Sequence, residues 1–304
     1  MLSQLVILNP CAGRRQAGRH LDELLALLEA DGVTAQLYET DAAGDAERLV
    51  AERAGQYARV VCIGGDGTLN EVISGMIRSG ADVPIGYIPA GSTNDLAASH
   101  GLSRDLARAA RDVVEGTAVP IDVGLFNGRC FVYTASFGIF TRASYGAPQA
   151  AKNALGHLAY IFEGAKDLIR VRSWHVAVET DAERFEDDYI FGTLSNSTSM
   201  GGVLKLDPSC VDLHDGKFEL LFVRMPKNLG ELVRVASALQ ARRYDHELLR
   251  FISTPGARIC AEPDMPWTLD GEYQPGSESV QIENLHNAVR LIVPAKNAQG
   301  EEAP

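Results

Sequence analysis

The sequence contains no lysine before Lys152, and this absence limits how its first half can bind phosphate. The segment closest to a P-loop is GRRQAGRH, residues 13–20, in which Arg19 and His20 stand where that motif has lysine and Ser or Thr. A Walker-type nucleoside triphosphatase is therefore excluded for this half. Any phosphate site there has to use backbone N–H groups, helix N-termini and arginine.

Cysteine is also scarce. The five cysteines are odd in number and lie 50 or more residues apart, with no C-x-x-C and no Cys–His pair at the spacing of zinc ligands. A disulfide framework and a structural zinc site are therefore not expected. This cysteine usage favours a reducing compartment, and we expect a cytoplasmic protein.

Basic residues and long apolar runs are missing as well. Lys and Arg total 28 against 40 Asp and Glu, a net charge of −12, which argues against nucleic acid as a partner and against polybasic anchoring to anionic lipid. The chain has no run of 18 apolar residues, and its start lacks the basic region of a signal peptide. Peripheral association with the inner face of the membrane stays open.

The remaining composition is that of a globular protein, with 46% hydrophobic and 22% charged residues. At about 150 residues per domain, 304 residues indicate two domains. We predict a nucleotide-binding α/β domain over residues 1–125 and a β-rich domain over residues 126–294, followed by a tail over 295–304. The prediction allows the last strand of the second domain to belong to the sheet of the first domain.

The first half alternates short apolar runs with segments of helical periodicity. Strands are predicted at residues 5–8, 33–38, 60–63 and 83–88, with amphipathic helices between them. This alternation predicts a parallel sheet flanked by helices, with ligands beyond the carboxyl ends of the strands.

The second half has a different pattern. Residues 121–126 and 130–134 flank Asn127-Gly128, which predicts a β-hairpin with a type I′ turn. Several short strand-like runs follow, interrupted by helical segments near residues 149–169 and 229–241. This pattern predicts an antiparallel sandwich or barrel.

The clearest motif is GGDGTLNE, residues 64–71, which follows a predicted strand and opens a predicted helix. Its glycines allow the backbone to approach a ligand closely, and N–H groups at a helix N-terminus favour phosphate. Thr68 and Glu71 have the spacing of a capping box, which predicts that Thr68 starts the helix. A turn without a ligand is the less favoured alternative. A dinucleotide-binding fingerprint would need glycine where Asn70 stands.

Two further loops are predicted to reach the same edge of the sheet. PAGSTND, residues 89–95, combines a flexible turn with two hydroxyls and a carboxylate, although helix capping by Ser92 or Thr93 would explain it equally well. NPCAG, residues 9–13, follows the first strand. Because the carboxyl ends of parallel strands meet at one edge, the three loops together indicate a nucleotide site.

Two acidic segments lie far downstream. LDGE, residues 269–272, places two carboxylates around a glycine, and DLHDGK, residues 212–217, is a second Asp-Gly segment. Taken alone, each is more simply an exposed turn. The alternative for residues 212–217 is a hard-cation site in which one carboxylate and neighbouring carbonyls bind Mg²⁺.

In combination, GGDGTLNEV, PAGSTNDLA, NPCAG and LDGE resemble the bacterial soluble diacylglycerol kinases and related lipid kinases, which share a catalytic domain with eukaryotic diacylglycerol and sphingosine kinases. Their order and spacing match from Asn9 to about Pro294. GGDGT alone is also similar to NAD kinases and phosphofructokinase-like folds. The resemblance implies an NAD kinase-like α/β first domain and an antiparallel β-sandwich that forms the lipid side of a cleft.

The resemblance also implies an ATP site between the two domains. The implied ATP-binding residues are Asn9, Pro10, Cys11, Ala12, Gly13, Thr40, Gly64, Gly65, Asp66, Gly67, Thr68, Leu69, Asn70, Gly91, Ser92, Asn94 and Asp95. Ser92 stands where the family usually has threonine and keeps the hydroxyl. The implied structural Mg²⁺ loop uses the carbonyl of Leu213, the side chain of Asp215 and the carbonyl of Lys217, with His214 where the family usually has Asn or Asp.

The expected activity is ATP- and Mg²⁺-dependent transfer of the γ-phosphoryl group to a lipid hydroxyl, that of diacylglycerol, giving phosphatidic acid. Glu272 or Asp270 is expected to accept the hydroxyl proton, and Asp66 and Asp95, with Asp270, to organise a catalytic Mg²⁺. Two carboxylates this close are expected to raise the pKa of one of them. The alternatives are an NAD kinase-like or other small-molecule kinase, a sphingosine-type lipid kinase, and a non-catalytic nucleotide sensor.

A lipid substrate requires contact with a membrane surface, and the acidic chain predicts that apolar side chains make it. The candidates are residues 137–140 and a predicted helix with Leu155, Leu158, Ile161 and Phe162, for which the core of the second domain is the favoured alternative. The sequence leaves open whether the protein is a homodimer.

Overall fold

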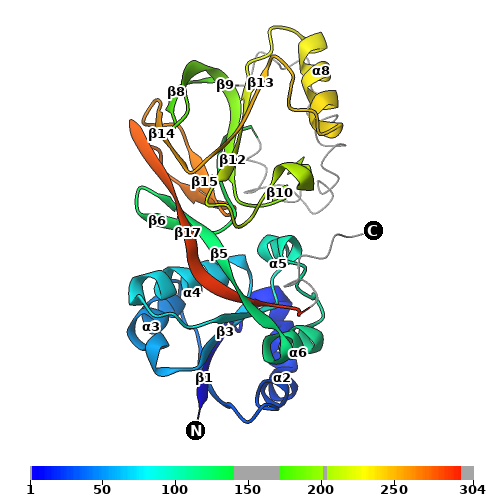
Figure 1. Ribbon diagram of the computed structural model, residues 1–304, viewed down its shortest axis with the longest axis vertical. Helices are drawn as coiled ribbons and strands as arrows, with labels where there is room; N and C mark the ends of the chain where they lie inside the picture. Colours follow the sequence, from blue (N-terminus) through cyan, green and yellow to red (C-terminus); the bar gives the residue numbers. More distant parts are fainter. Residues whose placement is uncertain (1, 140–171, 201–203, 296–304) are drawn as a thin grey trace. The chain divides into compact units, whose positions relative to one another are not determined.

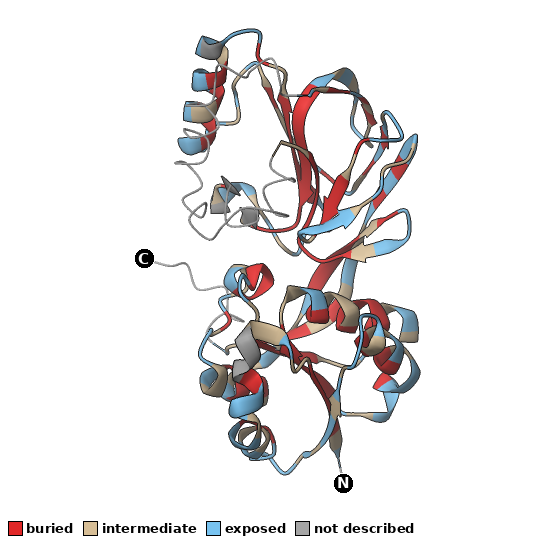
Figure 2. Ribbon diagram, turned by 180° about the vertical axis from the view of Figure 1, so that it is seen from behind, coloured by how far each residue is buried: buried red, intermediate tan, exposed pale blue. Residues whose placement is uncertain are grey.

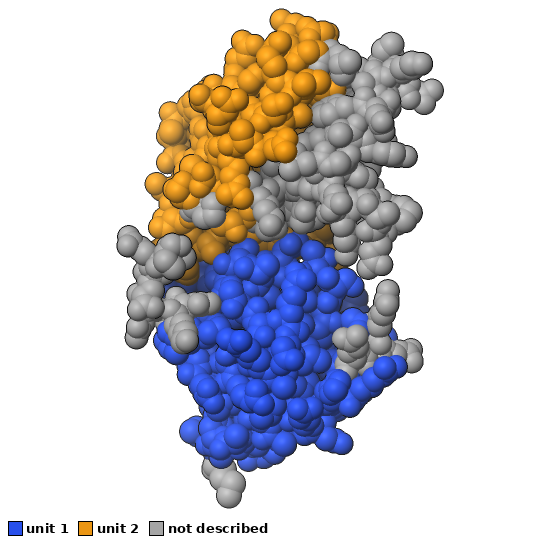
Figure 3. Space-filling view, turned by 90° about the vertical axis from the view of Figure 1, so that its right-hand side faces the viewer, with its two compact units in different colours: residues 1–122, 287–304 blue, residues 123–286 orange. Residues whose placement is uncertain are grey.

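The computed structural model describes residues 2–139, 172–200 and 204–295 (Figure 1). The chain forms two compact units, residues 1–122 with 287–304 and residues 123–286, which Figure 3 colours separately. It passes between them in β5 (Thr117–Phe126) and in β17 (Ser279–Val293). The boundary expected at residues 125 and 126 thus lies within β5, and the end of β17 is part of unit 1.

Unit 1 is built on a parallel sheet with the strand order β17-β4-β3-β1-β2. Its strands besides β17 are β1 (Ser3–Leu8), β2 (Thr34–Glu39), β3 (Arg59–Gly64) and β4 (Ile85–Pro89). Every residue of β3 and β4 is buried (Figure 2), as expected for strands that are covered on both faces. The predicted α/β class is confirmed.

Helices lie between these strands in the chain. They are α1 (Gln16–Arg19), α2 (Leu21–Leu28), α3 (Asp45–Arg53), α4 (Asp66–Ser79), α5 (Asp95–Ser99) and α6 (Leu106–Glu115), with 3₁₀ turns at Ala12–Arg15 and Ala54–Gln56. In α4, Leu69, Val72, Ile73 and Met76 follow helical spacing and are buried. The helix ends at Gly80, whose φ of 65° closes it in the left-handed region.

The predicted capping box at the start of α4 is wrong. The helix begins at Asp66 with Gly65 as its N-cap, so Thr68 already lies inside the first turn. The carboxylate of Glu71 instead accepts hydrogen bonds from the N–H groups of Gly44 (2.8 Å) and Ala46 (3.2 Å), at the start of α3. The spacing of Thr68 and Glu71 was sufficient for the motif, but a neighbouring helix supplies the N–H groups that Glu71 binds.

Unit 2 is antiparallel, which confirms the predicted class of the second half. Its strands follow the order β16-β15-β7-β9-β8-β14-β17, while β12 pairs with β9 and β13, and β5 pairs with β6 and β17. The strands are β6 (Arg129–Phe131), β7 (Thr134–Gly138), β8 (Trp174–Glu179), β9 (Arg184–Ser195), β10 (Ser199–Met200), β11 (Leu204–Lys205), β12 (Phe218–Arg224), β13 (Leu249–Thr254), β14 (Gly256–Cys260), β15 (Trp267–Leu269) and β16 (Glu272–Gln274). A 3₁₀ turn at Pro208–Cys210 and helix α8 (Leu229–Gln240) complete the described part.

Alternation along the strands separates two apolar clusters in unit 2. Phe218, Leu220 and Phe222 of β12 belong to an aromatic core with Phe137 and Trp267. Leu221 and Val223, which alternate with them along β12, belong to a second cluster with residues of α8. Strand β12 is therefore covered by apolar side chains on both faces.

Some expectations lie outside the described residues. These are the predicted helix near residues 149–169, the apolar candidates Phe140, Leu155, Leu158, Ile161 and Phe162, and all but the first residue of the tail. Within the described ranges, none of the helices is long and apolar enough to span a membrane.

Candidate functional site

The three predicted loops follow β1, β3 and β4, and the structure brings them together at the carboxyl edge of the unit 1 sheet. The side-chain amide of Asn9 donates to the hydroxyl of Thr68 over 3.0 Å. The backbone N–H of Asn9 donates to Ile63, and that of Ala90 to Gly64. Residues that are far apart in the sequence therefore share one surface, as the sequence predicts.

Glycine is required where these loops touch. Gly13 has a φ of +53°, and a Cβ added there would lie 1.8 Å from the carbonyl oxygen of Ala90. A Cβ on Gly91 would lie 2.6 Å from the Cα of Gly65. The backbones of the three loops approach more closely than any side chain would allow.

Asn94 fixes the turn between β4 and α5. It adopts the left-handed conformation at a φ of 54°, and its side chain is buried. Its Oδ1 accepts from the N–H of Gly91 (3.0 Å) and the hydroxyl of Tyr87 (3.2 Å), while its Nδ2 donates to the carbonyl of Gly91 (3.0 Å). These contacts occupy the amide within the turn, so Asn94 positions the loop.

Asp66 joins the β3 loop to the β4 loop. Its Oδ2 accepts from the N–H of Asn94 over 2.8 Å, whereas its buried Oδ1 has no hydrogen-bond partner among the described residues. Burial raises the pKa of the Asp66 carboxyl, and N–H donors at Asn94, Asp95 and Leu96 oppose that rise. A cation or a hydrogen-bond donor at Oδ1 would offset the cost of burying this oxygen.

The other predicted nucleotide residues differ in exposure. Cys11, Gly67 and Ser92 are exposed, and no side chain in the described part caps the first turn of α4. Pro10 follows β1, Ala12 begins a 3₁₀ turn and Gly64 ends β3. Asn70 lies within α4, where its Oδ1 accepts from the hydroxyl of Ser74 over 3.4 Å. This edge therefore offers unfilled N–H groups and a hydroxyl, the donors that bind phosphate.

Three of the predicted residues are buried or turned toward the protein. The side chain of Leu69 is in the core, and Asp95 is 4% exposed at the start of α5. Thr40 donates its N–H to the carbonyl of Leu8 over 2.9 Å, beside the end of β1. For Leu69 only the backbone could face a ligand.

In unit 2, LDGE forms the hairpin between β15 and β16. Asp270 and Gly271 have φ values of 49° and 85°, as a type I′ turn requires. The carboxylate of Asp270 accepts three backbone N–H groups, those of Val132 (2.6 Å), Tyr133 (3.0 Å) and Thr134 (3.0 Å). Both oxygens thus bind the chain between β6 and β7, which favours a positioning role for Asp270 over that of a proton acceptor.

Glu272 lies at the start of β16 with its side chain 64% exposed. Its Oε2 is 3.3 Å from Nη2 of Arg129, whose Nη1 also donates to Gln274 over 2.7 Å. Glu272 and Asp270 therefore bind different groups. Glu272 is the acidic residue of LDGE whose carboxylate faces solvent.

A cluster of hydroxyls supports the strand that holds Asp270. Thr134, Ser136 and Thr193 are buried, and their oxygens lie 3.0 Å from one another. The N–H of Thr134 is also one of the three donors to Asp270. The hairpin is therefore fixed to a part of β7 that is itself held by β9.

The predicted metal loop, residues 212–217, is an exposed turn in which only Leu213 and Gly216 are half-buried. Asp215 Oδ1 accepts from the N–H of Lys217 (2.9 Å), and the carbonyl of Lys217 accepts from Asn284 (3.2 Å). His214 places Nδ1 3.9 Å from Asp212. In the described ranges no three His, Cys, Asp or Glu side chains are grouped so that they could hold a metal.

Sequence reasoning missed the side chains that support the predicted ones. Tyr87 lies in a buried strand, where an aromatic residue gives no functional signal, and Arg129 is one of many arginines. Asp122 was also missed, although a carboxylate inside the apolar strand β5 is a signal. It is 1% exposed and accepts from the N–H of Asn287 over 2.8 Å.

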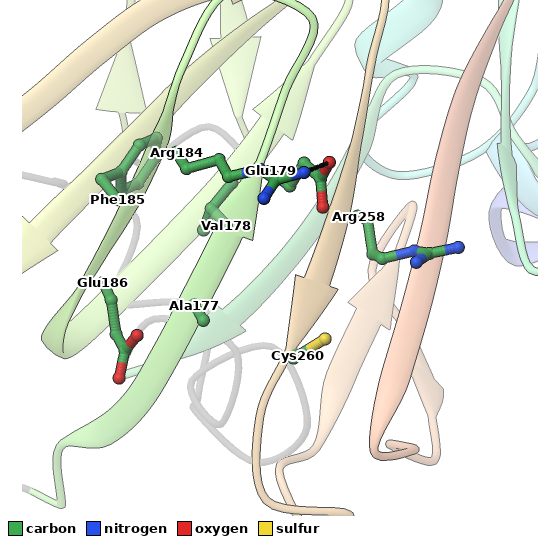
Figure 4. Close-up of a pocket in the computed structure, with 8 residues that line it drawn as sticks. All are labelled: Ala177, Val178, Glu179, Arg184, Phe185, Glu186, Arg258 and Cys260. Carbon is green, nitrogen blue, oxygen red and sulfur yellow. Dashed lines mark hydrogen bonds and ion pairs between the residues drawn. The ribbon is translucent and has the colours of Figure 1, made fainter.

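A pocket on β8, β9 and β14 contains none of the predicted residues (Figure 4). Arg184 points to Glu179 and forms an ion pair with it, whereas Arg258 extends away from that pair. The charge of Arg184 is thus balanced within the protein.

A family profile described as "Diacylglycerol kinase catalytic domain" matches residues 3–126. The chain is 33% identical over 297 residues to a diacylglycerol kinase of Bacillus subtilis, covering 97% of both, and 32% identical over 292 residues to one of Staphylococcus carnosus, covering 95% of this chain and 94% of that one.

Two crystal structures of Bacillus anthracis proteins share the fold. Their TM-scores are 0.78 and 0.73 at 22% and 20% identity, and each comparison covers 96% of both chains. The second structure is that of a diacylglycerol kinase. At these identities the likeness concerns the fold alone.

Gly13→Ala is expected to lower the free energy of unfolding by more than about 2 kcal/mol, because the new Cβ overlaps the carbonyl of Ala90 as well as straining φ. Urea denaturation measures this loss. Gly44→Ala is the matched control, since Gly44 has a φ of +86° but open space around its Cβ position. It should lose only about 1 kcal/mol, and equal losses in the two variants would contradict the close-approach argument.

Asp270→Asn is expected to lower the free energy of unfolding by about 1–3 kcal/mol, because an amide nitrogen would face a backbone N–H donor. Glu272→Gln should change it by less than about 0.5 kcal/mol, since that side chain is exposed. Urea denaturation of both variants tests the difference. A Glu272 variant as destabilised as the Asp270 variant would show that Asp270 is not the anchor.

Proposed function

The chain belongs to the diacylglycerol kinase family, and from this premise we propose that it is an ATP- and Mg²⁺-dependent lipid kinase. It transfers the γ-phosphoryl group of ATP to the free hydroxyl of diacylglycerol and forms phosphatidic acid and ADP. Membership of a kinase family implies nucleotide use. The observation that carries the proposal is the meeting of three glycine-containing loops beside the uncapped start of α4.

Backbone N–H groups of residues 64–68 hold phosphate oxygens in this proposal, since no lysine is present in the first 151 residues. The exposed hydroxyl of Ser92 and the loop of residues 9–13 border the same edge. The residues fit a nucleotide because their glycines let the backbones of the three loops pack closely at one edge, where the N–H groups of neighbouring loops can bind the same phosphate chain. Phosphoryl transfer needs such positioning more than covalent chemistry from the protein.

The buried Oδ1 of Asp66 is the observation that fits a catalytic cation, because a carboxylate oxygen with no partner is an available ligand. Asp95, whose carboxylate lies at the start of α5, is the second proposed residue of this group. When bound, Mg²⁺ supplies neutralisation of the phosphate charge. Asp270 is assigned a different role, since its carboxylate is held by three N–H groups.

Glu272 is the proposed general base. It accepts the proton of the acceptor hydroxyl as that oxygen forms its bond to the γ-phosphorus and the bond to ADP breaks. Arg129 contacts the Glu272 carboxylate and orients it, and the Asp270 anchor sets the hairpin on which Glu272 lies. The neighbouring Tyr273 is 57% exposed, which places an aromatic side chain next to the proposed base.

The structural cation loop is a further part of the proposal, with the carbonyls of Leu213 and Lys217 and the side chain of Asp215 as ligands. One carboxylate with neighbouring carbonyls is a donor set that suits Mg²⁺.

We also propose that contact with a membrane surface depends on apolar side chains, because the chain carries a net charge of −12. Binding to vesicles of zwitterionic lipid should then be unaffected by salt.

The proposal is tested by measuring phosphate transfer from ATP–Mg²⁺ to diacylglycerol, sphingosine, an undecaprenol-type alcohol and NAD. Glu272→Gln is expected to lower kcat at least about 100-fold while leaving the Kd for ATP nearly unchanged, because the variant lacks the proton acceptor. Glu278→Gln, at an exposed position of the same unit, is the control and should keep its activity.

The acceptor identifies the activity. Product from diacylglycerol supports the proposal, product from sphingosine alone makes the protein a sphingosine-type kinase, and product from NAD alone assigns the NAD kinase alternative. ATP binding without transfer to any acceptor would favour a nucleotide sensor. A Glu272→Gln variant with unchanged kcat would exclude Glu272 as the base.

A further inference from the structure

The guanidinium of Arg129 lies beside the proposed general base and is held by two side chains of one strand. Its Nη2 is 3.3 Å from Oε2 of Glu272, and its Nη1 donates to Oε1 of Gln274 over 2.7 Å. The side chains of Arg129 and Glu272 are 52% and 64% exposed. The other N–H groups of Arg129 bind no residue in the described ranges, so a ligand could reach them.

The two partners of Arg129 differ in charge. Glu272 and Gln274 are two residues apart on β16, so their side chains point to the same side of the strand. Gln274 is neutral, and it therefore fixes the guanidinium without cancelling its positive charge. Glu272 cancels that charge only as long as its carboxylate is ionised.

The proposed reaction changes this balance of charge. As the acceptor oxygen bonds to the γ-phosphorus, the hydroxyl proton moves to Glu272, the bond to ADP breaks and its electron pair leaves with ADP. Glu272 is then neutral, so Arg129 loses its negative partner in the step that gives the acceptor a phosphate group. At neutral pH such a phosphomonoester carries a charge of about −1.5 to −2.

The base also fixes where the new phosphate lies. The acceptor oxygen has to be within hydrogen-bond reach of Glu272 to lose its proton, and the same oxygen then carries the phosphate. A guanidinium 3.3 Å from the Glu272 carboxylate is therefore close to that phosphate. Arginine suits this contact, because its planar N–H groups can bind two phosphate oxygens at once.

We propose that Arg129 is a catalytic residue that binds the transferred phosphoryl group and then the phosphomonoester of the lipid product. The inference rests on the proposed function, because it takes Glu272 as the base. Before transfer Arg129 stabilises the ionised Glu272, after transfer it binds the phosphate, and Gln274 holds it in place in both states. The lipid that has no phosphate gains nothing from Arg129.

The test is calorimetric binding of two short-chain lipids, dihexanoyl phosphatidic acid and dihexanoylglycerol, to the full chain without nucleotide. Arg129→Gln is expected to weaken binding of the phosphatidic acid at least about 10-fold, because a charge-assisted contact to the phosphate is lost. Its Kd for dihexanoylglycerol should change less than about 2-fold, since that lipid offers no charged acceptor. A residue that only oriented Glu272 would not distinguish the two lipids.

Glu272→Gln has the charge of the base after proton transfer and tests the same inference from the other side. It should bind the phosphatidic acid at least about 3-fold more tightly than the native chain, because Arg129 is no longer neutralised and no carboxylate repels the phosphate.

Arg184→Gln is the matched control, because Arg184 is an exposed arginine of the same unit that is also paired with a carboxylate, that of Glu179. It should bind both lipids as the native chain does. The inference is overturned if Arg129→Gln binds the phosphatidic acid as tightly as the native chain, if it loses dihexanoylglycerol by the same factor, or if Glu272→Gln does not bind the phosphatidic acid more tightly. Each of these results leaves the proposed kinase intact as long as lipid product forms from ATP and Glu272→Gln abolishes it.

Discussion

The close approach of three backbones at the carboxyl edge of the unit 1 sheet is the constraint on which the proposed nucleotide site depends. Gly13 lies against the carbonyl of Ala90, and Gly65 against Gly91, at separations that exclude a Cβ. Asn94 closes the turn that brings Gly91 to this place, and Asp66 binds that turn through the N–H of Asn94. The motif residues therefore hold the three loops together at this edge. Because the loops lie close to one another, their backbone N–H groups can act together where no lysine is present.

In unit 2, the acidic residue Asp270 fixes the loop that carries the predicted site, as the glycines do in unit 1. Asp270 binds three successive N–H groups between β6 and β7, and a type I′ turn then directs the chain into β16. Glu272 emerges on the far side of that turn, exposed and beside Arg129. Two carboxylates separated by one glycine therefore have unequal roles, because the turn points one into the protein and the other to solvent.

The sequence predicts the fold well because its signals are local. Alternating apolar runs and helical periodicity indicated the parallel sheet, and Asn127-Gly128 indicated the hairpin of β5 and β6, with φ values of 47° and 82°. The proximity of Asn9 and Thr68 was also predictable from the sequence, because the carboxyl ends of parallel strands lie at the same edge of a sheet. The different roles of Asp270 and Glu272 were not predictable from the sequence. They depend on the segment between β6 and β7, which binds Asp270 and lies about 137 residues away in the sequence. The buried Glu219 was missed as well, although, like Asp122, it is a carboxylate inside an apolar strand.

The one local motif that failed explains how the site stays available. A capping box at Thr68 and Glu71 would have satisfied N–H groups at the start of α4 with protein side chains. Instead, Glu71 binds the start of α3, and the Thr68 hydroxyl accepts from Asn9. The first turn of α4 is left without a side-chain cap at the edge where the three loops meet. A helix N-terminus that keeps its donors is less stable by itself, and it gains that stability back when an anion binds there. The departure from the local rule therefore falls where the proposed phosphate site needs unfilled donors, and the Glu71 carboxylate, which would repel phosphate, binds the start of α3 instead.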